Sequence, residues 1–105
     1  MIAEIQAKFS QDKFEYSEHA LQQGLSRKIR IDEALEAIAQ GEVIEDYPED
    51  RYGPSCLIFG FTQSGRPLHI QCTYPERPLI KVITLYEPNI DIWINHKIRR
   101  LKDEK

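Results

Sequence analysis

The side chains best suited to proton transfer near neutral pH are the three histidines, His19, His69 and His96. Ser17 is expected to cap a helix that runs to about Leu25, which places His19 in the first helical turn. The helix dipole disfavours protonation there and keeps the imidazole available as a base. His19 also falls on the face opposite the apolar residues of this helix, so it is either a base at a site or an ordinary exposed histidine.

His69 lies in the stretch Leu68 to Tyr74, whose alternation is typical of a β-strand. His69, Gln71 and Thr73 share one face of this strand, and the apolar residues between them share the other. A histidine within a polar row on a sheet is well placed for proton transfer. The alternative is a solvent-facing residue on a half-exposed sheet.

Two arginines and a tyrosine could complete such a site. Arg51 lies in the turn-rich loop 48–54 (PEDRYGP), where its planar guanidinium could hold a phosphate or pair with a neighbouring acid. Arg66 follows a tight turn and could bind substrate or simply be solvated. In a regular strand, one face would carry Tyr86, Thr84, Val82 and Ile80. Metal-free RNA cleavage needs a base, a cation and an acid, which His, Arg and Tyr can supply.

Metal and cofactor motifs are missing from the sequence. There is no HExxH, no CxxC pair, no calcium loop, no P-loop and no glycine-rich dinucleotide loop. Cys56 and Cys72 are expected to be reduced strand residues. We therefore expect neither a metal ion nor a cofactor.

The bulk composition describes one ordinary folded domain. The chain has 105 residues, of which 41% are hydrophobic and 30% charged, with a net charge of −3. An acidic balance argues against a protein that coats nucleic acid, but it allows an enzyme that touches RNA at one small site. The start of the chain lacks the features of a secretory signal, and no apolar run approaches the roughly 20 residues that span a bilayer. We expect a cytoplasmic protein with no membrane contact.

The spacing of apolar residues predicts helices first and strands afterwards. Three short helices are expected over residues 2–11, 17–25 and 32–40, and a brief extended piece over 14–16. Asp32 is expected to cap the third helix, and Gly41 to end it in a left-handed conformation. The buried stripe of the third helix would consist of Ile31, Ala34, Leu35 and Ile38. Strands are expected over 43–47, 56–62, 68–74 and 79–86.

This order predicts an α+β fold in a single domain, 1–105. Two or three N-terminal helices would pack on one face of a mostly antiparallel sheet of roughly four strands. The apolar strand 79–86 would be central. The tail, 90–105, is expected to be a helix that packs Ile92, Trp93 or Ile98 against the domain. Its basic residues either contact a partner or form a solvated helix face.

Five segments together resemble a bacterial family known as DUF4258. They are SEHAL (17–21), EALEAIAQGEVIEDYPEDR (33–51), PSCLIFGFT (54–62), GRPLHIQC (65–72) and VITLYEP (82–88). That family in turn is similar to the BrnT and RelE toxins, with a strand, two helices and then antiparallel strands. One departure stands out: many relatives place an arginine one turn after the helix histidine, where this chain has Gln22 and Gln23.

The resemblance implies the toxin of a type II toxin–antitoxin module, a metal-independent endoribonuclease whose partner is a small antitoxin of the zinc-finger type. The family's polar positions fall on His19, Arg51, Ser55, His69, Thr84 and Tyr86. Together with the reading of the residues, this predicts His19, His69, Arg51 and Tyr86 as catalytic and Ser55, Gln71, Thr84 and Arg66 as substrate-binding. The alternative is a non-catalytic module of the same fold that docks a partner through the sheet face or the basic tail. A homodimer is a further alternative.

Overall fold

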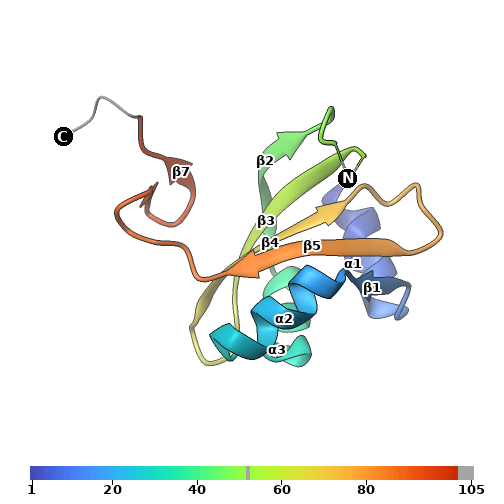
Figure 1. Ribbon diagram of the computed structural model, residues 1–105, viewed down its shortest axis with the longest axis horizontal. Helices are drawn as coiled ribbons and strands as arrows, with labels where there is room; N and C mark the ends of the chain where they lie inside the picture. Colours follow the sequence, from blue (N-terminus) through green and yellow to red (C-terminus); the bar gives the residue numbers. More distant parts are fainter. Residues whose placement is uncertain (52, 102–105) are drawn as a thin grey trace.

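The computed structural model describes residues 1–51 and 53–101, and in this part of the chain three helices precede most of the strands (Figure 1). The helices are α1 (Ile2–Ser10), α2 (Glu18–Arg27) and α3 (Ile31–Ala39). The strands are β1 (Phe14–Tyr16), β2 (Glu42–Tyr47), β3 (Ser55–Phe61), β4 (Pro67–Thr73), β5 (Ile80–Tyr86), β6 (Trp93–Ile94) and β7 (Ile98–Arg99). The α+β class is therefore confirmed.

The main sheet has the order β1-β5-β4-β3-β2, and its strands are antiparallel except that β1 runs parallel to β5. The sheet of the described residues thus has five strands, where the sequence predicted roughly four. The brief extended piece at 14–16 is the additional strand, because its backbone pairs with Ile80, Lys81 and Val82. The prediction that strand 79–86 is central is confirmed, since β5 has a neighbour on each side.

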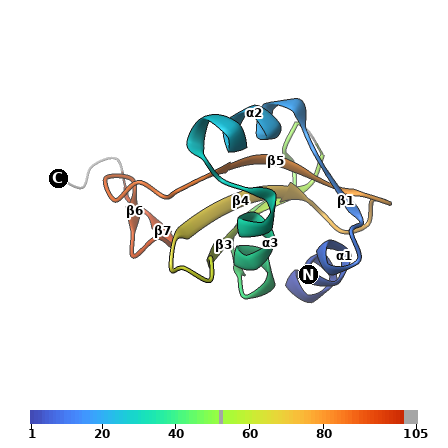
Figure 2. The ribbon, with the colours of Figure 1, turned by 90° about the horizontal axis from the view of Figure 1, so that it is seen from below.

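The three helices share one apolar core with one face of the sheet. Figure 2 shows α2 alongside β5 and α3 across β3 and β4. The core combines Ile5 and Phe9 of α1 with Ala20 of α2 and Ile38 of α3. The sheet supplies Cys56, Ile58, Leu68, Ile70, Cys72, Ile80, Val82 and Leu85. Both cysteines are buried and free, as expected. The helices do not cover the opposite face of the sheet, which carries His69 and Gln71.

The start of α2 matches its sequence signal. Ser17 is the N-cap, and its side-chain oxygen accepts a hydrogen bond from the backbone N–H of Ala20. The side chain also fastens the helix to the sheet, because its hydroxyl donates to the carbonyl of Ile83 at 3.2 Å. Further along α2, Arg27 donates to the carbonyl of Leu85 at 2.8 Å. The carbonyls of Ile83 and Leu85 lie on the edge of β5 beyond the short stretch that pairs with β1. These two bonds therefore supply the hydrogen-bond partners that a neighbouring strand would otherwise provide.

The start of α3 differs from the prediction. The N-cap position is Arg30 instead of Asp32, and the carboxylate of Glu33 folds back to accept from the Arg30 backbone N–H at 3.0 Å. With the helix beginning earlier, Ile31 occupies its first turn and is exposed, while Ala34 and Ile38 are buried as predicted. Leu35 is only partly buried.

The prediction for Gly41 is also wrong. Among the described residues only Gly53 and Gly65 are glycines with positive φ, and the C-cap of α3, Gln40, has a φ of −117°. Gly41 instead permits a close approach. A Cβ there would lie 2.8 Å from both the carbonyl oxygen of Ala37 and Cγ2 of Ile58. The glycine therefore lets the chain pass between α3 and β3.

The tail is a hairpin instead of the expected helix. Asn95 and His96 have φ values of 52° and 66°, and the backbone N–H of Lys97 donates to the carbonyl of Ile94. Two successive residues with positive φ give a turn that suits two antiparallel strands. The turn joins β6 to β7, whereas Lys102 and the residues after it lie outside the described part. No helix of the described part is long and apolar enough to cross a membrane.

A bulge changes the face assignment in β5. Gln71 pairs with Thr84 but Cys72 pairs with Val82, so the register shifts by one residue at Ile83. Ile80 and Val82 therefore point into the core, whereas Thr84 and Tyr86 lie on the opposite face beside Gln71 and His69. The expectation that these four residues of the strand share one face is wrong because the bulge inverts the alternation.

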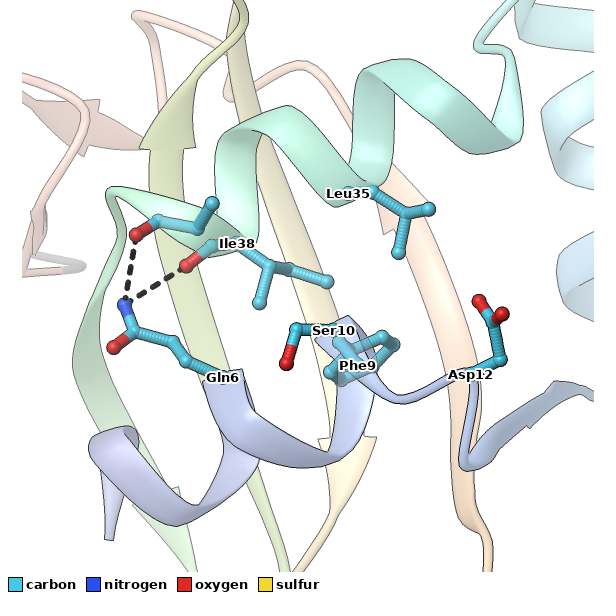
Figure 3. Close-up of a pocket in the computed structure, with 7 residues that line it drawn as sticks. Gln6, Phe9, Ser10, Asp12, Leu35 and Ile38 are labelled. Atoms are coloured by element: carbon cyan, nitrogen blue, oxygen red, sulfur yellow. Dashed lines mark hydrogen bonds between the residues drawn. The ribbon is translucent and has the colours of Figure 1, made fainter.

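A hollow of about 270 Å³ separates α1 from α3 (Figure 3). Gln6 reaches across one end of it, and its amide nitrogen donates to the carbonyls of Ile38 at 3.0 Å and Ala39 at 3.2 Å. These carbonyls belong to the last turn of α3, where carbonyl groups have no hydrogen-bond donor within the helix. Phe9 and Leu35 line the rest of the hollow. The hydrogen bonds of Gln6 fasten α1 to the end of α3. No histidine lines this hollow, so it is not part of the candidate site.

Candidate functional site

His69 lies on the sheet face opposite the helices, but the β6–β7 hairpin covers it. Its exposed fraction is 0%. The ring of Trp93 stands perpendicular to the imidazole with ring centres 4.5 Å apart, and Phe59 closes another side at 5.8 Å. The alternative of a solvent-facing histidine is therefore wrong. The sequence predicted that the tail packs against the domain, with Trp93 among the candidate residues, but it predicted a helix and did not place the tail over His69.

The hydrogen bonds of His69 fix its tautomer. Nε2 lies 2.6 Å from the carbonyl oxygen of His96, and because a carbonyl can only accept, Nε2 carries the proton. Nδ1 is then free to accept from the hydroxyl of Tyr86, 3.3 Å away. Burial lowers the pKa of His69, so the ring is neutral at pH 7 and directs a basic lone pair at Tyr86.

Tyr86 connects this histidine to an open hollow of about 430 Å³. The hollow is lined by Tyr86, Arg27, Ile29, Arg66 and Glu87. Burial raises the pKa of Tyr86, which keeps its hydroxyl protonated and able to donate. Tyr86 is half-buried, and it is the residue shared by the His69 pair and the hollow among the described residues.

The two arginines at the hollow differ in how many hydrogen-bond and ion-pair partners they have. Arg66 binds Glu87 at 2.6 Å and Glu33 at 3.3 Å, and it also donates to two carbonyls at the end of α2. It therefore clamps the β3–β4 turn onto the helices. Arg27 donates to the carbonyl of Leu85, and no carboxylate of the described part lies within ion-pair distance of it. Its remaining N–H groups are available to an anion.

The predicted polar residues of this face are present, but their side chains form hydrogen bonds within the protein. Gln71 donates to the hydroxyl of Ser55 at 3.1 Å, and Ser55 is fully buried. Thr84, the register partner of Gln71, donates to the side-chain oxygen of Gln23 at 2.5 Å. These three predicted substrate-binding residues thus lie together and support the sheet beside His69 and Tyr86.

The structure does not bring His19 or Arg51 to the hollow. His19 is exposed at the start of α2, about 12 Å along the helix from Arg27. It joins the polar row only indirectly, because the amide of Gln23 lies 2.7 Å from its Nε2. Arg51 lies in the loop that precedes Ser55, at the opposite end of β3 from Phe59, the register partner of His69.

Five residues around His69 and the hollow were not among the site residues predicted from the sequence. Trp93 and Arg99 belong to the unforeseen hairpin, and the Arg99 guanidinium lies over the Trp93 ring at 4.5 Å and binds Glu45 at 3.1 Å. Glu45 also accepts from the hydroxyl of Tyr47. Arg27 ends α2 and reaches the hollow only because that helix lies along β5. No local sequence pattern predicts the Arg99–Glu45 ion pair or the Arg27–Leu85 hydrogen bond, because each joins segments far apart in the chain.

The burial of His69 makes the stability of the protein depend on pH. Because its pKa is lowered in the folded state, the unfolded chain takes up a proton more readily, and the free energy of unfolding should fall as the pH drops below the ordinary histidine value of about 6.5. Urea denaturation at neutral pH and near pH 5.5 measures this change. His69→Gln keeps a donor for the His96 carbonyl but does not titrate, so its change should be smaller. An equal change in both proteins would contradict the assignment.

The donor set does not suggest a metal centre. Within residues 1–51 and 53–101, no group of three His, Cys, Asp or Glu side chains is arranged to hold a metal ion. The histidine nitrogens that would serve as ligands at His69 both have hydrogen-bond partners.

The comparison with protein families gives one match. The model of DUF4258, a domain of unknown function, matches residues 16–87. No curated protein and no solved structure matches the sequence. The matched region contains α2, α3 and β2 to β5, and therefore His69, Tyr86 and the whole hollow, whereas α1 and the hairpin lie outside it. Because this match covers more than half of the chain, the protein belongs to the DUF4258 family.

Proposed function

We propose that this protein is a metal-independent endoribonuclease, the toxin of a type II toxin–antitoxin module. The observation that supports the proposal most strongly is the position of Tyr86. Its hydroxyl is held by a buried, neutral His69, and its side chain lines a hollow that Arg27 also borders. Tyr86, the partner of the buried His69, and an available cation thus line the same open hollow, and phosphodiester cleavage without a metal requires both a proton-transfer group and a cation.

In the proposed reaction the tyrosine relays protons to and from the histidine. The 2′-hydroxyl of the RNA gives its proton to the Tyr86 oxygen while the Tyr86 proton moves to Nδ1 of His69, and the 2′-oxygen attacks the phosphorus. The imidazolium then returns its proton through Tyr86 to the departing 5′-oxygen. The products are a 2′,3′-cyclic phosphate and a free 5′-hydroxyl, with no net change in protonation. The carbonyl of His96 keeps Nδ1 aimed at Tyr86 in both steps.

Arg27 would stabilise the charge that develops on the phosphate. Its guanidinium can donate two parallel hydrogen bonds to phosphate oxygens, a geometry that lysine lacks. In this proposal Arg27 takes the role that the sequence assigned to Arg51. Arg66 is a positioning residue, because its donors are engaged with Glu33, Glu87 and backbone carbonyls.

The toxin assignment adds a cytoplasmic location, a protein antitoxin and a likeness of fold to BrnT and RelE. Its support is the order of elements within residues 14–86, in which a short strand and two helices precede four strands that pair as antiparallel neighbours. The main alternative is a non-catalytic binding module on the same fold.

Incubation with a mixed-sequence RNA in excess EDTA tests the proposal. The purified protein should cut the RNA and leave cyclic phosphate ends, which mass spectrometry detects. Expression of the chain without its antitoxin should also arrest bacterial growth. RNA that stays intact at stoichiometric protein would overturn the enzyme assignment and favour the binding module. Cleavage that disappears in EDTA would overturn the metal-free mechanism.

A further inference from the structure

An apolar groove with exposed walls runs between the end of α2 and the start of α3. The exposed fractions of its wall residues are 47% for Leu21, 82% for Leu25 and 48% for Ile31. Ile29, in the turn between the helices, is buried and also lines the groove. Large apolar side chains gathered at one concave place are typical of a protein-binding surface, whereas single exposed ones are common everywhere.

The exposed leucines follow from how α2 is packed. Only Ala20 and Gly24 of this helix are buried, so the helix approaches β5 on its small residues and leaves its leucines outside. A Cβ at Gly24 would lie 3.1 Å from the carbonyl oxygen of Ile29, which shows how tightly the chain turns there. The spacing of Ala20, Leu21, Gly24 and Leu25 along the sequence predicts one apolar helix face, yet in the structure Leu21 and Leu25 are exposed.

The charge around the groove has one sign. Its lining includes Lys28 and Arg30 and no acidic residue. Arg30 is paired with Asp32 at 3.0 Å, but no carboxylate of the described residues lies within ion-pair distance of Lys28. Tyr16 also lines the groove, and its buried hydroxyl has no hydrogen-bond partner in the described part of the chain. The groove therefore presents apolar walls and a cation without a carboxylate partner.

We infer that this groove binds an amphipathic helix of a partner protein, with leucine-like residues on one face and acidic residues beside them. The apolar face would cover Leu21, Leu25 and Ile31, and the acids would meet Lys28. A volume of about 500 Å³ accommodates several apolar side chains. Ile29 lines this groove and the Tyr86 hollow, so the occupant would border the proposed site. The inference does not rest on ribonuclease activity.

Peptide binding tests the inference directly. The probe is a labelled synthetic helix of about 18 residues, five turns, with leucine at helical spacing and glutamate on either side. A second peptide has lysine at each glutamate position. Fluorescence anisotropy should show that the acidic peptide binds about tenfold more tightly than the basic one, because like charges at an interface are costly. Lys28→Glu should reverse the preference.

Two control variants distinguish binding in the groove from non-specific hydrophobic binding. Leu25→Glu should abolish binding without affecting the fold, because this side chain is largely exposed. Ile90→Glu changes another exposed apolar residue outside the groove and should bind as the wild type does. Equal affinity for both peptides, no binding of either, or unchanged binding by Leu25→Glu would overturn the inference. A dimer that Leu25→Glu dissociates, without peptide binding, would assign the groove to a second copy of this chain instead.

Discussion

Replacing Tyr86 with phenylalanine is expected to slow metal-free RNA cleavage about 100-fold, the lower end of what a positioned proton-transfer group contributes. The substitution keeps the half-buried ring and removes only the hydroxyl that lies 3.3 Å from Nδ1 of His69. Without that hydroxyl, the buried imidazole has no path to a substrate in the hollow. Single-turnover rates in excess EDTA, measured at equal enzyme concentration, give the comparison.

The matched control is His19→Ala. His19 is exposed, lies at the other end of α2 from the hollow, and contacts only Gln23 among the hydrogen bonds of the described residues. Its removal should leave the cleavage rate within about twofold of the wild type, well below the hundredfold effect of a proton-transfer group. A large loss in His19→Ala beside full activity in Tyr86→Phe would contradict the Tyr86 relay and return the base to His19.

His69→Gln supplies a second check on the relay. The amide can still donate to the His96 carbonyl, so the hairpin keeps its anchor while the proton acceptor is lost. Both variants should melt as single cooperative transitions, which excludes unfolding as the cause of lost activity. If Tyr86→Phe is slow but His69→Gln is as fast as the wild type, the tyrosine acts without the histidine and the relay is wrong.

Much of the fold could be predicted because its signals are local. Ser17 begins α2 through a side-chain cap, and the alternation from Leu68 to Cys72 assigns the two faces of β4 correctly. The parallel pairing of β1 with β5 could not be predicted in the same way, because it joins Phe14 to Ile80 across most of the chain. The hairpin was missed because its turn uses Asn95 and His96 at positive φ, where glycine would have given a clear signal.

The candidate site was predicted in part for the same reason. The polar row on β4 follows from alternation within one strand, so His69 and Gln71 were found. The face of the sheet on which Tyr86 lies depends on a bulge in β5 opposite Cys72, and the spacing of residues in the sequence does not predict this bulge. The cation was assigned to Arg51 in the loop before β3, yet Arg27 and Arg66 are the arginines that line the hollow, and of these two only Arg66 was a predicted site residue. Arg27 lies at the same hollow as Tyr86 because α2 packs along β5, and no local sequence pattern predicts this packing.

Gly60→Ala is expected to lower the free energy of unfolding by about 3 kcal/mol, the upper end for an overpacked core. A Cβ at Gly60 would lie 1.9 Å from the carbonyl oxygen of Ala37 and 2.7 Å from its carbonyl carbon. Both atoms are backbone, so no side-chain rotation relieves the clash, and α3 must move away from β3. Urea denaturation monitored by circular dichroism measures the change.

Gly65→Ala is the matched control for this prediction. Nothing lies within 4 Å of a Cβ built at Gly65, but its φ of +90° is one that residues with a side chain rarely adopt. Backbone strain alone should cost about 1–2 kcal/mol there. A smaller loss in Gly60→Ala than in Gly65→Ala would mean that α3 can shift without cost. Because Gly60 follows Phe59, which packs on His69, such a shift would also move a wall of the proposed site.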